Sequence, residues 1–168
     1  YSEWVGTADG LVNATIRAQV TGYLLKQNYR EGDFVRAGQV LFEVDPRTFQ
    51  AAVDAAKGSL AQAEARWVTA KANLDRVRPL AARNAVSQKD LDDAVGAEQS
   101  TRASVDSAKA QLEEAQLNLG FTRITSPVDG IAGIAKAQVG NLVGPGQIQE
   151  LTAVSTVDPI KVYFSISE

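Results

Sequence analysis

The residue types that carry most enzyme chemistry are either absent from this sequence or spread along helical segments. Its 168 residues include no His and no Cys, which excludes zinc clusters, Ser-His triads and thiol chemistry among them. Carboxylates are frequent, and the most closely grouped are Asp90, Asp92, Asp93, Glu113 and Glu114. They occur without a glycine-rich phosphate loop, in segments that favour helices, where charges usually form a solvated face. We therefore expect no enzyme activity, no metal and no cofactor.

Composition indicates an ordinary globular protein and does not favour a nucleic-acid partner. Hydrophobic residues make up 45% of the chain and charged residues 22%, with a net charge of −3. A nucleic-acid surface would require a basic patch or a basic balance. No apolar run approaches the roughly 20 residues of a membrane-spanning helix. Because the chain begins at Tyr1 and contains no Met, we interpret it as a fragment of a longer protein.

The sequence contains one β-rich stretch twice, as IRAQVTGYLLKQNYREGDFVRAGQV and ITSPVDGIAGIAKAQVGNLVGPGQI. An ungapped offset of 108 gives seven identities over 25 positions. The identical pairs are Ile16/Ile124, Val20/Val128, Gly22/Gly130, Gly32/Gly140, Val35/Val143, Gly38/Gly146 and Gln39/Gln147. Short runs of Val, Ile and Leu predict strands, and EGD and VGN predict turns between them. Each copy is too small to fold alone, so we expect the two to pack face to face as a small β-sandwich.

The intervening segment, residues 46–120, has a helical composition, with 18 Ala in 75 residues. Asp45 can cap its start, and Pro46 suits the first helical position. Seam residues recur at a spacing of about 3.5, which is typical of a coiled coil. In the second half, Glu98 and Thr101 are polar and should weaken the seam. The predicted seam residues are Phe49, Val53, Ala56, Leu60, Ala63, Trp67, Ala70, Leu74, Val77 and Ala81, then Leu91, Ala94, Glu98, Thr101, Val105, Ala108, Leu112, Ala115 and Leu119.

A break in PLAARNAVSQKD is predicted to divide this segment into two antiparallel helices. Pro79 should disrupt the first helix, and Asn84 can turn the chain. Ser87, with Asp90 three residues later, is close to a capping box and should begin the second helix. Gly120 should end that helix as a C-cap. About 38 residues at 1.5 Å each give an arm of roughly 55 Å, too long to pack along so small a sandwich.

The two ends of the chain also predict strands. Residues 1–12 favour one strand, and in VDPIKVYFSIS the residues Ile160, Val162, Phe164 and Ile166 alternate with polar or aromatic ones. Such alternation indicates a half-buried strand. We expect the two end strands to pair as part of a further domain that this chain contains only in part.

A β-sandwich split by a helical hairpin resembles the periplasmic adaptor proteins, or membrane fusion proteins, of tripartite efflux pumps of the resistance-nodulation-division (RND) type. The matching stretches are IRAQVTGYL, EGDFVRAGQVLFEVDP, TRITSPVDGIAG, VGNLVGPGQ and VDPIKVYFSISE. The resemblance implies an α+β fold: a split biotinyl/lipoyl-like β-sandwich, an inserted antiparallel coiled-coil hairpin, and edge strands of a truncated β-barrel domain. Its expected segments are 1–12 (β-barrel strand), 13–45 and 121–150 (lipoyl-like halves), 46–120 (hairpin) and 151–168 (start of the β-barrel domain).

The resemblance also implies an adaptor without catalysis, which links an inner-membrane RND transporter to a TolC-like outer-membrane channel for efflux of drugs or other small molecules. It implies a hexameric ring in the periplasm, held to the inner membrane by a segment outside this chain, with the transporter on the β-barrel side. In the family an Arg, a Leu four residues later and a Ser seven residues further on contact the channel. Arg76, Leu80 and Ser87 have this spacing here.

Other interpretations stay open beside the RND adaptor. A lipoyl-like fold suggests a carrier modified on a lysine, but the hairpin replaces the turn that would present it, and Lys89 lies at a helix start. A coiled-coil scaffold that only dimerises would explain the hairpin without the duplicated β-unit. An adaptor of an ABC or major-facilitator exporter is a further alternative. Each tip residue also has a structural interpretation, with Ser87 as a cap, Leu80 as a last core residue and Arg76 as a solvated side chain.

Overall fold

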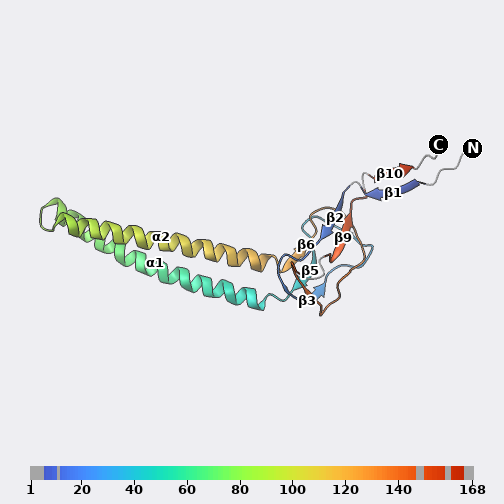
Figure 1. The fold of residues 1–168 in the computed structure, drawn as a ribbon, viewed down its shortest axis with the longest axis horizontal. Helices are drawn as coiled ribbons and strands as arrows, with labels where there is room; N and C mark the ends of the chain where they lie inside the picture. Colours follow the sequence, from blue (N-terminus) through green and yellow to red (C-terminus); the bar gives the residue numbers. More distant parts are fainter. Residues whose placement is uncertain (1–5, 11, 147–149, 158–159, 165–168) are drawn as a thin grey trace, which may run out of the picture. The chain divides into compact units, whose positions relative to one another are not determined.

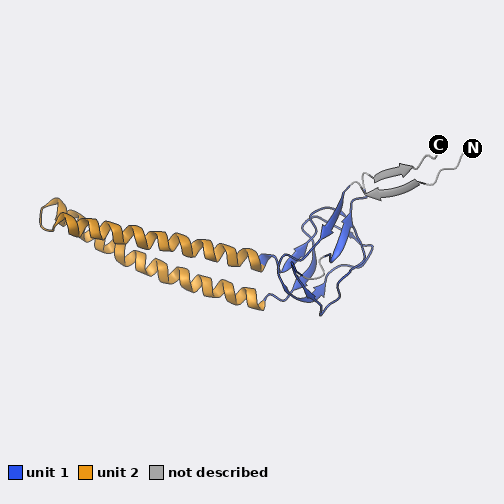
Figure 2. Ribbon diagram, viewed as in Figure 1, with its two compact units in different colours: residues 1–46, 120–168 blue, residues 47–119 orange. Residues whose placement is uncertain are grey.

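The computed structural model describes residues 6–10, 12–146, 150–157 and 160–164. The chain divides into a β-unit, residues 1–46 and 120–168, and a helical unit, residues 47–119 (Figure 2). Most strands of the β-unit are short, and several are labelled in Figure 1. They are β1 (Gly6–Gly10), β2 (Asn13–Ile16), β3 (Gly22–Gln27), β4 (Phe34–Val35), β5 (Val40–Val44), β6 (Arg123–Thr125), β7 (Gly130–Ala132), β8 (Leu142–Val143), β9 (Thr152–Ser155) and β10 (Ile160–Phe164).

Two four-stranded sheets form the sandwich of the β-unit, in the orders β2-β9-β7-β4 and β6-β5-β3-β8. We expected the two copies of the repeat to be separate units packed face to face, and this expectation is wrong. The first sheet combines β2 and β4 from the side of the first copy with β7 of the second copy and β9, which follows that copy. The other sheet combines β3 and β5 with β6 and β8. The copies are therefore interlocked by strand pairing.

Strand β9 also corrects a boundary, because it lies in the segment 151–168 that we assigned to a further domain. Its residues pair with β2, where Ile16 stands opposite Thr152, and with β7, where Ala132 stands opposite Val154. Val154 is fully buried. In its sheet β9 occupies the place that β5 occupies in the other sheet, so the second copy of the repeat needs β9 to complete the sandwich.

The strands at the two ends of the chain pair with each other. β1 and β10 are antiparallel, with Gly6 opposite Phe164 and Gly10 opposite Ile160. The expected pairing of the chain ends is thus confirmed. Ile166, which we predicted to continue the alternation, lies outside the described residues.

Backbone hydrogen bonds repeat at the same offset as the sequence. Gly32 donates its N–H to the carbonyl of Ala132 at 2.8 Å, and Gly140 donates its N–H to the carbonyl of Leu24 at 2.7 Å. Both glycines have positive φ, 86° and 93°, a conformation that residues with a side chain rarely adopt. Glycine recurs at these two positions because the same backbone shape is needed twice.

The turns predicted from EGD and VGN are present and have equivalent hydrogen bonds. The carboxylate of Asp33 accepts a hydrogen bond from the N–H of Arg30 at 3.1 Å. The side-chain carbonyl of Asn141 accepts one from the N–H of Gln138 at 2.9 Å. Both side chains supply the oxygen acceptor that such a turn requires. This shared role explains why Asp and Asn replace each other between the copies.

One hydrophobic core fills the space between the two sheets. Leu24 and Phe42 from one sheet, and Val35 and Val154 from the other, are fully buried in it. The ring of Tyr29 meets Phe42 edge-on, with the centroids 5.4 Å apart, an arrangement that aromatic pairs favour. Burial raises the pKa of the Tyr29 phenol above its ordinary value. Because both sheets share these contacts, the core ties the two copies of the repeat together.

The helical unit consists of two long helices that run side by side, α1 (Arg47–Ala82) and α2 (Gln88–Gly120) (Figure 1). Every residue predicted for the seam is buried or half-buried, so the coiled-coil periodicity is confirmed. Among the described residues, no helix is apolar enough over a sufficient length to cross a membrane. The buried seam residues are Val53, Leu74, Ala94, Val105 and Ala108.

Both helices end where the sequence predicts, with two differences in detail. The expected disruption at Pro79 does not end the first helix, because α1 continues to Ala82. Proline removes one backbone hydrogen bond, and this loss is tolerated close to the end of a helix, where few further residues depend on it. Gly120 is the last residue of α2, as predicted, but it lacks the positive φ of a left-handed cap. The chain instead passes into the sheet, where Val44 donates its N–H to the carbonyl of Thr122 at 2.8 Å.

The polar middle of the seam contains a hydrogen bond between the helices. Trp67 of α1 donates its indole N–H to the carboxylate of Glu98 on α2 at 2.8 Å, and both side chains are half-buried. Thr101 donates its hydroxyl to the carbonyl of Ala97 at 2.8 Å. The ammonium of Lys71 lies 5.2 Å from the centre of the Trp67 ring, within cation–π range. The polar groups that we expected to weaken the seam are therefore paired.

Replacing Trp67 by Phe should destabilise the helical unit more than replacing Glu98 by Gln. Phe keeps a ring in the seam but leaves the carboxylate of Glu98 without its donor, at a cost of about 1 kcal/mol. Gln keeps an oxygen acceptor at the same place. Thermal melting of the full-length protein, followed by the helical circular dichroism signal, compares the two variants. Equal melting temperatures would show that the hydrogen bond adds nothing to stability.

Candidate functional site

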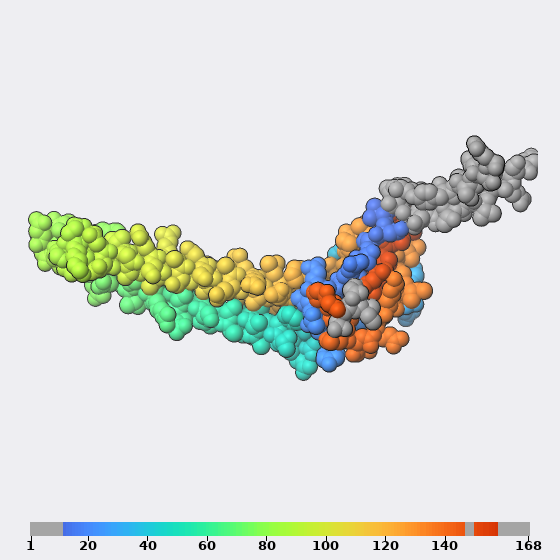
Figure 3. Space-filling view, viewed as in Figure 1, coloured from blue at the N-terminus to red at the C-terminus, as the bar shows by residue number. Residues whose placement is uncertain are grey.

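The two helices are joined at one end of the helical unit by the turn 83–87 (Figure 1). The carbonyl of Leu80 accepts hydrogen bonds from the N–H groups of Arg83 at 3.1 Å and Ala85 at 2.9 Å. Asn84 has a φ of 55°, in the left-handed region that Asn enters more readily than most residues. The prediction that Asn84 turns the chain is confirmed. In the space-filling view the side chains around the turn, in green, cover the end of the hairpin (Figure 3).

Ser87 caps α2 through reciprocal hydrogen bonds with Asp90. The hydroxyl of Ser87 donates to the Asp90 carboxylate at 2.6 Å, and the N–H of Ser87 donates to it at 3.1 Å. The N–H of Asp90 donates in return to the Ser87 hydroxyl oxygen at 3.1 Å. This confirms the predicted capping box, with Asp in the place of the more usual Glu. Ser87 therefore has a structural role at the tip in addition to any contact with a partner.

The Ser87–Asp90 capping box should make the stability of the tip depend on pH. Hydrogen bonds from the Ser87 side chain, and then from its backbone, lower the pKa of Asp90 below its ordinary value of 3.8. Such a carboxyl contributes stability that is complete above its unfolded pKa and is lost as pH falls through its lower folded pKa. In an NMR titration, Ser87→Ala should raise the pKa of Asp90 toward the ordinary value. An unchanged pKa would contradict the role of Ser87.

Arg76 and Leu80 lie on one side of α1, because residues four apart on a helix are neighbours. Leu80 keeps 43% of its surface exposed, so it is not the last core residue, whereas its neighbour Ala81 is half-buried in the seam. Arg76 is exposed, and its Nε donates to the carbonyl of Ala72 at 3.2 Å. In the described part of the chain, Arg76 takes part in no ion pair. A cation and an apolar side chain are thus presented to solvent together.

The three predicted site residues share one end of the helical unit but differ in their surroundings. Arg76 and Leu80 offer free surface on α1, whereas the Ser87 hydroxyl is engaged with Asp90. Sequence reasoning missed Arg78 and Arg83, which are also exposed at this end. The sequence does contain a signal for them, because Arg76, Arg78 and Arg83 occur within eight residues before and in the turn. The tip therefore carries more positive charge on its α1 side than the predicted trio alone supplies.

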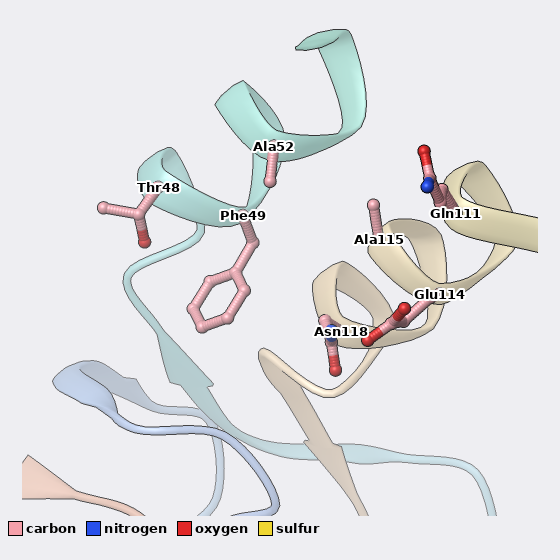
Figure 4. A pocket seen from close by; sticks show the side chains of 7 residues that line it. All are labelled: Thr48, Phe49, Ala52, Gln111, Glu114, Ala115 and Asn118. Carbon is pink, nitrogen blue, oxygen red and sulfur yellow. The ribbon is translucent and has the colours of Figure 1, made fainter. Parts of the chain in front are cut away.

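A cleft of about 380 Å³ opens between the helices at their other end (Figure 4). Ala52 and Ala115 are too small to fill this space, and Phe49 forms part of its wall. The sequence period placed Phe49 and Ala115 in the seam, but a period does not show how far apart two helices lie. Among the described residues, no group of three His, Cys, Asp or Glu could hold a metal ion. The cleft is lined by Thr48, Phe49, Ala52, Gln111, Glu114, Ala115 and Asn118.

Known proteins match the sandwich and the hairpin of this chain as one continuous region. The family model described as "RND MFP, barrel-sandwich hybrid domain" matches residues 12–155. The chain belongs to this family of membrane fusion proteins. The membrane fusion protein is 39% identical over 161 residues to the multidrug export protein AcrE of Escherichia coli strain K12. It is 40% identical over 149 residues to the multidrug efflux pump subunit AcrA of the same strain.

The matched region is most of this chain but only part of those relatives. It covers 96% of the chain and 42% of AcrE, and 89% of the chain and 38% of AcrA. The chain therefore spans about two fifths of the length of the curated relatives it matches. These 168 residues therefore do not include the regions that make up the rest of those relatives.

A solved structure shows the same combination of units. A crystal structure of a MacA-MexA chimeric protein, which contains the Pseudomonas aeruginosa MexA α-hairpin domain, has a TM-score of 0.70 at 29% identity. The match covers 97% of this chain and 53% of that one. ZneB from Cupriavidus metallidurans has a similar fold, with a TM-score of 0.63 at 22% identity. The α+β fold expected from the resemblance, with a hairpin inserted into a split sandwich, is confirmed.

Proposed function

We propose that the full-length membrane fusion protein is a periplasmic adaptor that links an inner-membrane RND transporter to a TolC-like outer-membrane channel for efflux of drugs or other small molecules. The observation that carries this proposal is the family match over residues 12–155. The names of two relatives, a multidrug export protein and a multidrug efflux pump subunit, support it. In this role the protein performs no catalysis and uses no cofactor.

The hairpin tip supplies the contact with the channel. Leu80 acts as an apolar anchor that packs between helices of the partner, and the neighbouring Arg76 pairs with a carboxylate there. Ser87 acts mainly by holding the shape of the turn, since its hydroxyl and N–H bind Asp90. One tip offers a small surface, and a hexameric ring of copies multiplies the affinity.

The other parts of the protein face the inner membrane in this proposal. Strands β1 and β10, at the two ends of this chain, lead into the β-barrel domain that contacts the transporter. A segment outside this chain anchors the adaptor to the inner membrane. The sandwich and the hairpin then form the part of the conduit between transporter and channel.

Site-specific photo-cross-linking in cells tests the channel contact. A photoreactive residue at position 80 of the full-length protein should cross-link to an outer-membrane channel. The same residue at position 117, where an exposed Leu lies near the other end of the helices, is the matched control and should not. Cross-linking at both positions, or at neither, would contradict the proposed role of the tip.

Genetic and biochemical measurements test the pump itself. Deleting the gene should increase susceptibility to several unrelated drugs, and the full-length gene on a plasmid should restore resistance. The transporter that copurifies with the adaptor should have the RND architecture. An ABC or major-facilitator transporter in its place would overturn the RND assignment, and a deletion without any export defect would overturn the adaptor function.

A further inference from the structure

The cleft between the helices, at the end away from the turn, is a part of the helical unit that the tip contact does not use. Small side chains keep it open, because Ala52 of α1 and Ala115 of α2 line it beside the ring of Phe49 (Figure 4). Farther along the helices Val53 and Ala108 are buried, so the seam is closed there. The cleft volume of about 380 Å³ lies within the range of small-molecule sites, roughly 300–1,000 Å³.

The lining of the cleft has an apolar part and a polar part. The ring of Phe49 and the methyl groups of the two alanines form the apolar part. The polar part consists of Gln111, Glu114 and Asn118, all from α2. In Figure 4 the ring of Phe49 lies across the cleft from the side chains of Glu114 and Asn118. A ligand in the cleft therefore meets an aromatic ring on one side and oxygen acceptors on the other.

The charge of Glu114 selects the sign of the ligand. Glu114 is the only charged residue among the seven described residues that line the cleft. In the described part of the chain it takes part in no ion pair. A carboxylate without a partner attracts a cation and repels an anion. The Phe49 ring acts in the same direction, because the face of an aromatic ring attracts positive charge.

We propose that this cleft binds a small amphiphilic cation in which an aromatic ring system carries an amine. The ring of the ligand packs against Phe49 and the two alanines, and its ammonium group donates hydrogen bonds to the carboxylate of Glu114. The side-chain carbonyls of Gln111 and Asn118 supply further acceptors for an ammonium group, which has three donors. This binding property goes beyond the adaptor function, which requires only the tip and the two ends of the conduit.

A ligand held in this way bridges the two helices. Its ring contacts Phe49 of α1, and its ammonium contacts Glu114 of α2. Because such a ligand binds the folded hairpin and not the unfolded chain, it stabilises the helical unit by mass action. The cleft is open to solvent and buries one small molecule only in part, so we expect a Kd on the order of 1 mM.

A titration of the purified full-length protein with 1-naphthylmethylamine tests the site, with binding followed by ligand-observed NMR. The wild type should bind this probe saturably, and the probe should raise the melting temperature of the helical circular dichroism signal. Glu114→Gln keeps the shape of the cleft but removes the charge, and should raise the Kd about three- to fivefold, as expected for a solvent-exposed ion pair. Ala52→Leu fills the cleft and should raise the Kd about tenfold or more.

Matched controls lie directly beside the two substituted residues. Glu113 and Ala51 are exposed and do not line the cleft, so Glu113→Gln and Ala51→Leu should leave the Kd unchanged. The neutral probe 1-naphthylmethanol has the same ring without the charge. It should bind the wild type and Glu114→Gln equally, because it makes no ion pair with the carboxylate. Melting curves without probe confirm that each variant is folded.

Several results would overturn the site. The wild type could show no saturable binding, or the two controls could weaken binding as much as Glu114→Gln and Ala52→Leu. Equal weakening of the amine and the alcohol by Glu114→Gln would overturn the choice of a cation. An apparent Kd that rises with protein concentration would assign the cleft to a second copy of the chain. The purified protein is measured alone, so a gene deletion without an export defect would contradict the adaptor function and leave this site unaffected.

Discussion

Leu80→Asp in the full-length protein should reduce drug efflux to the level of a strain without the gene. Its melting temperature should stay within about 2 °C of the wild type, because substitutions at exposed positions usually change stability by less than about 0.5 kcal/mol. Leu80 is 43% exposed, so little core contact is lost. At a docked tip, however, a carboxylate in place of an apolar anchor is desolvated without a partner, at a cost of about 2 kcal/mol or more. Drug susceptibility and thermal melting measure the two effects.

Two controls on the same helix separate the tip from the general surface of the hairpin. Val68 is an exposed apolar residue of α1 away from the turn, and Val68→Asp introduces the same charge there without loss of efflux. Arg76→Asp should act like Leu80→Asp, and Arg66→Asp is its control. Normal efflux in both tip variants would refute the tip assignment. Equal losses in the tip variants and the controls would assign the effect to the hairpin surface as a whole.

The hairpin could be predicted closely from the sequence because its signals are local. The seam follows from a spacing within each helix, and the capping box of Ser87 and Asp90 from residues three apart. The details that the sequence did not show at Pro79 and Gly120 depend on the position of each residue in the chain. Pro79 is close to a helix end, so α1 continues past it, and the sheet fixes the chain after Gly120 without a left-handed cap.

The exchange of strands between the two copies could not be predicted from the same signals. The repeat shows which residues are equivalent, and the turns at Gly32 and Gly140 follow from it. It does not show which strand lies beside which, because pairing is decided by contacts far apart in sequence. Phe42, for example, stands opposite Ile124 across the whole hairpin insertion. A resemblance between two segments is equally compatible with two stacked units and with two interlocked ones.

The candidate site was predictable in position but not in surroundings. The spacing of Arg76, Leu80 and Ser87 places all three near the turn, but their exposure depends on where the seam ends. In the structure Ala81 is half-buried and Leu80 is exposed, so the seam ends at Ala81 and Leu80 lies outside it. The exposure of Phe34 and Ile131 on the sandwich was missed for a related reason: an apolar residue in a strand predicts the core until the structure shows which face it occupies.

Phe42→Ala should destabilise the β-unit by about 3–5 kcal/mol, the usual range for a buried Phe. The side chain is 0% exposed and packs edge-on against Tyr29, with the ring centroids 5.4 Å apart, so its removal leaves a cavity in the core between the sheets. A domain of this kind has about 5–15 kcal/mol of stability in total, so the loss is a large part of it. Phe34→Ala is the matched control, because that side chain is 58% exposed and its loss should cost less than about 1 kcal/mol.

Hydrogen exchange on the full-length Phe42→Ala variant tests whether the copies of the repeat unfold together. Because β5 pairs with β6 from the other copy, with Phe42 opposite Ile124, amides of β6 should exchange faster along with those of β5. The middle of α1 and α2 should keep most of its protection, since its contacts lie in the separate seam of the helical unit. Faster exchange confined to β3 and β5, with β6 and β9 unchanged, would mean that each copy is stable by itself and that the interlocked pairing contributes little to the fold.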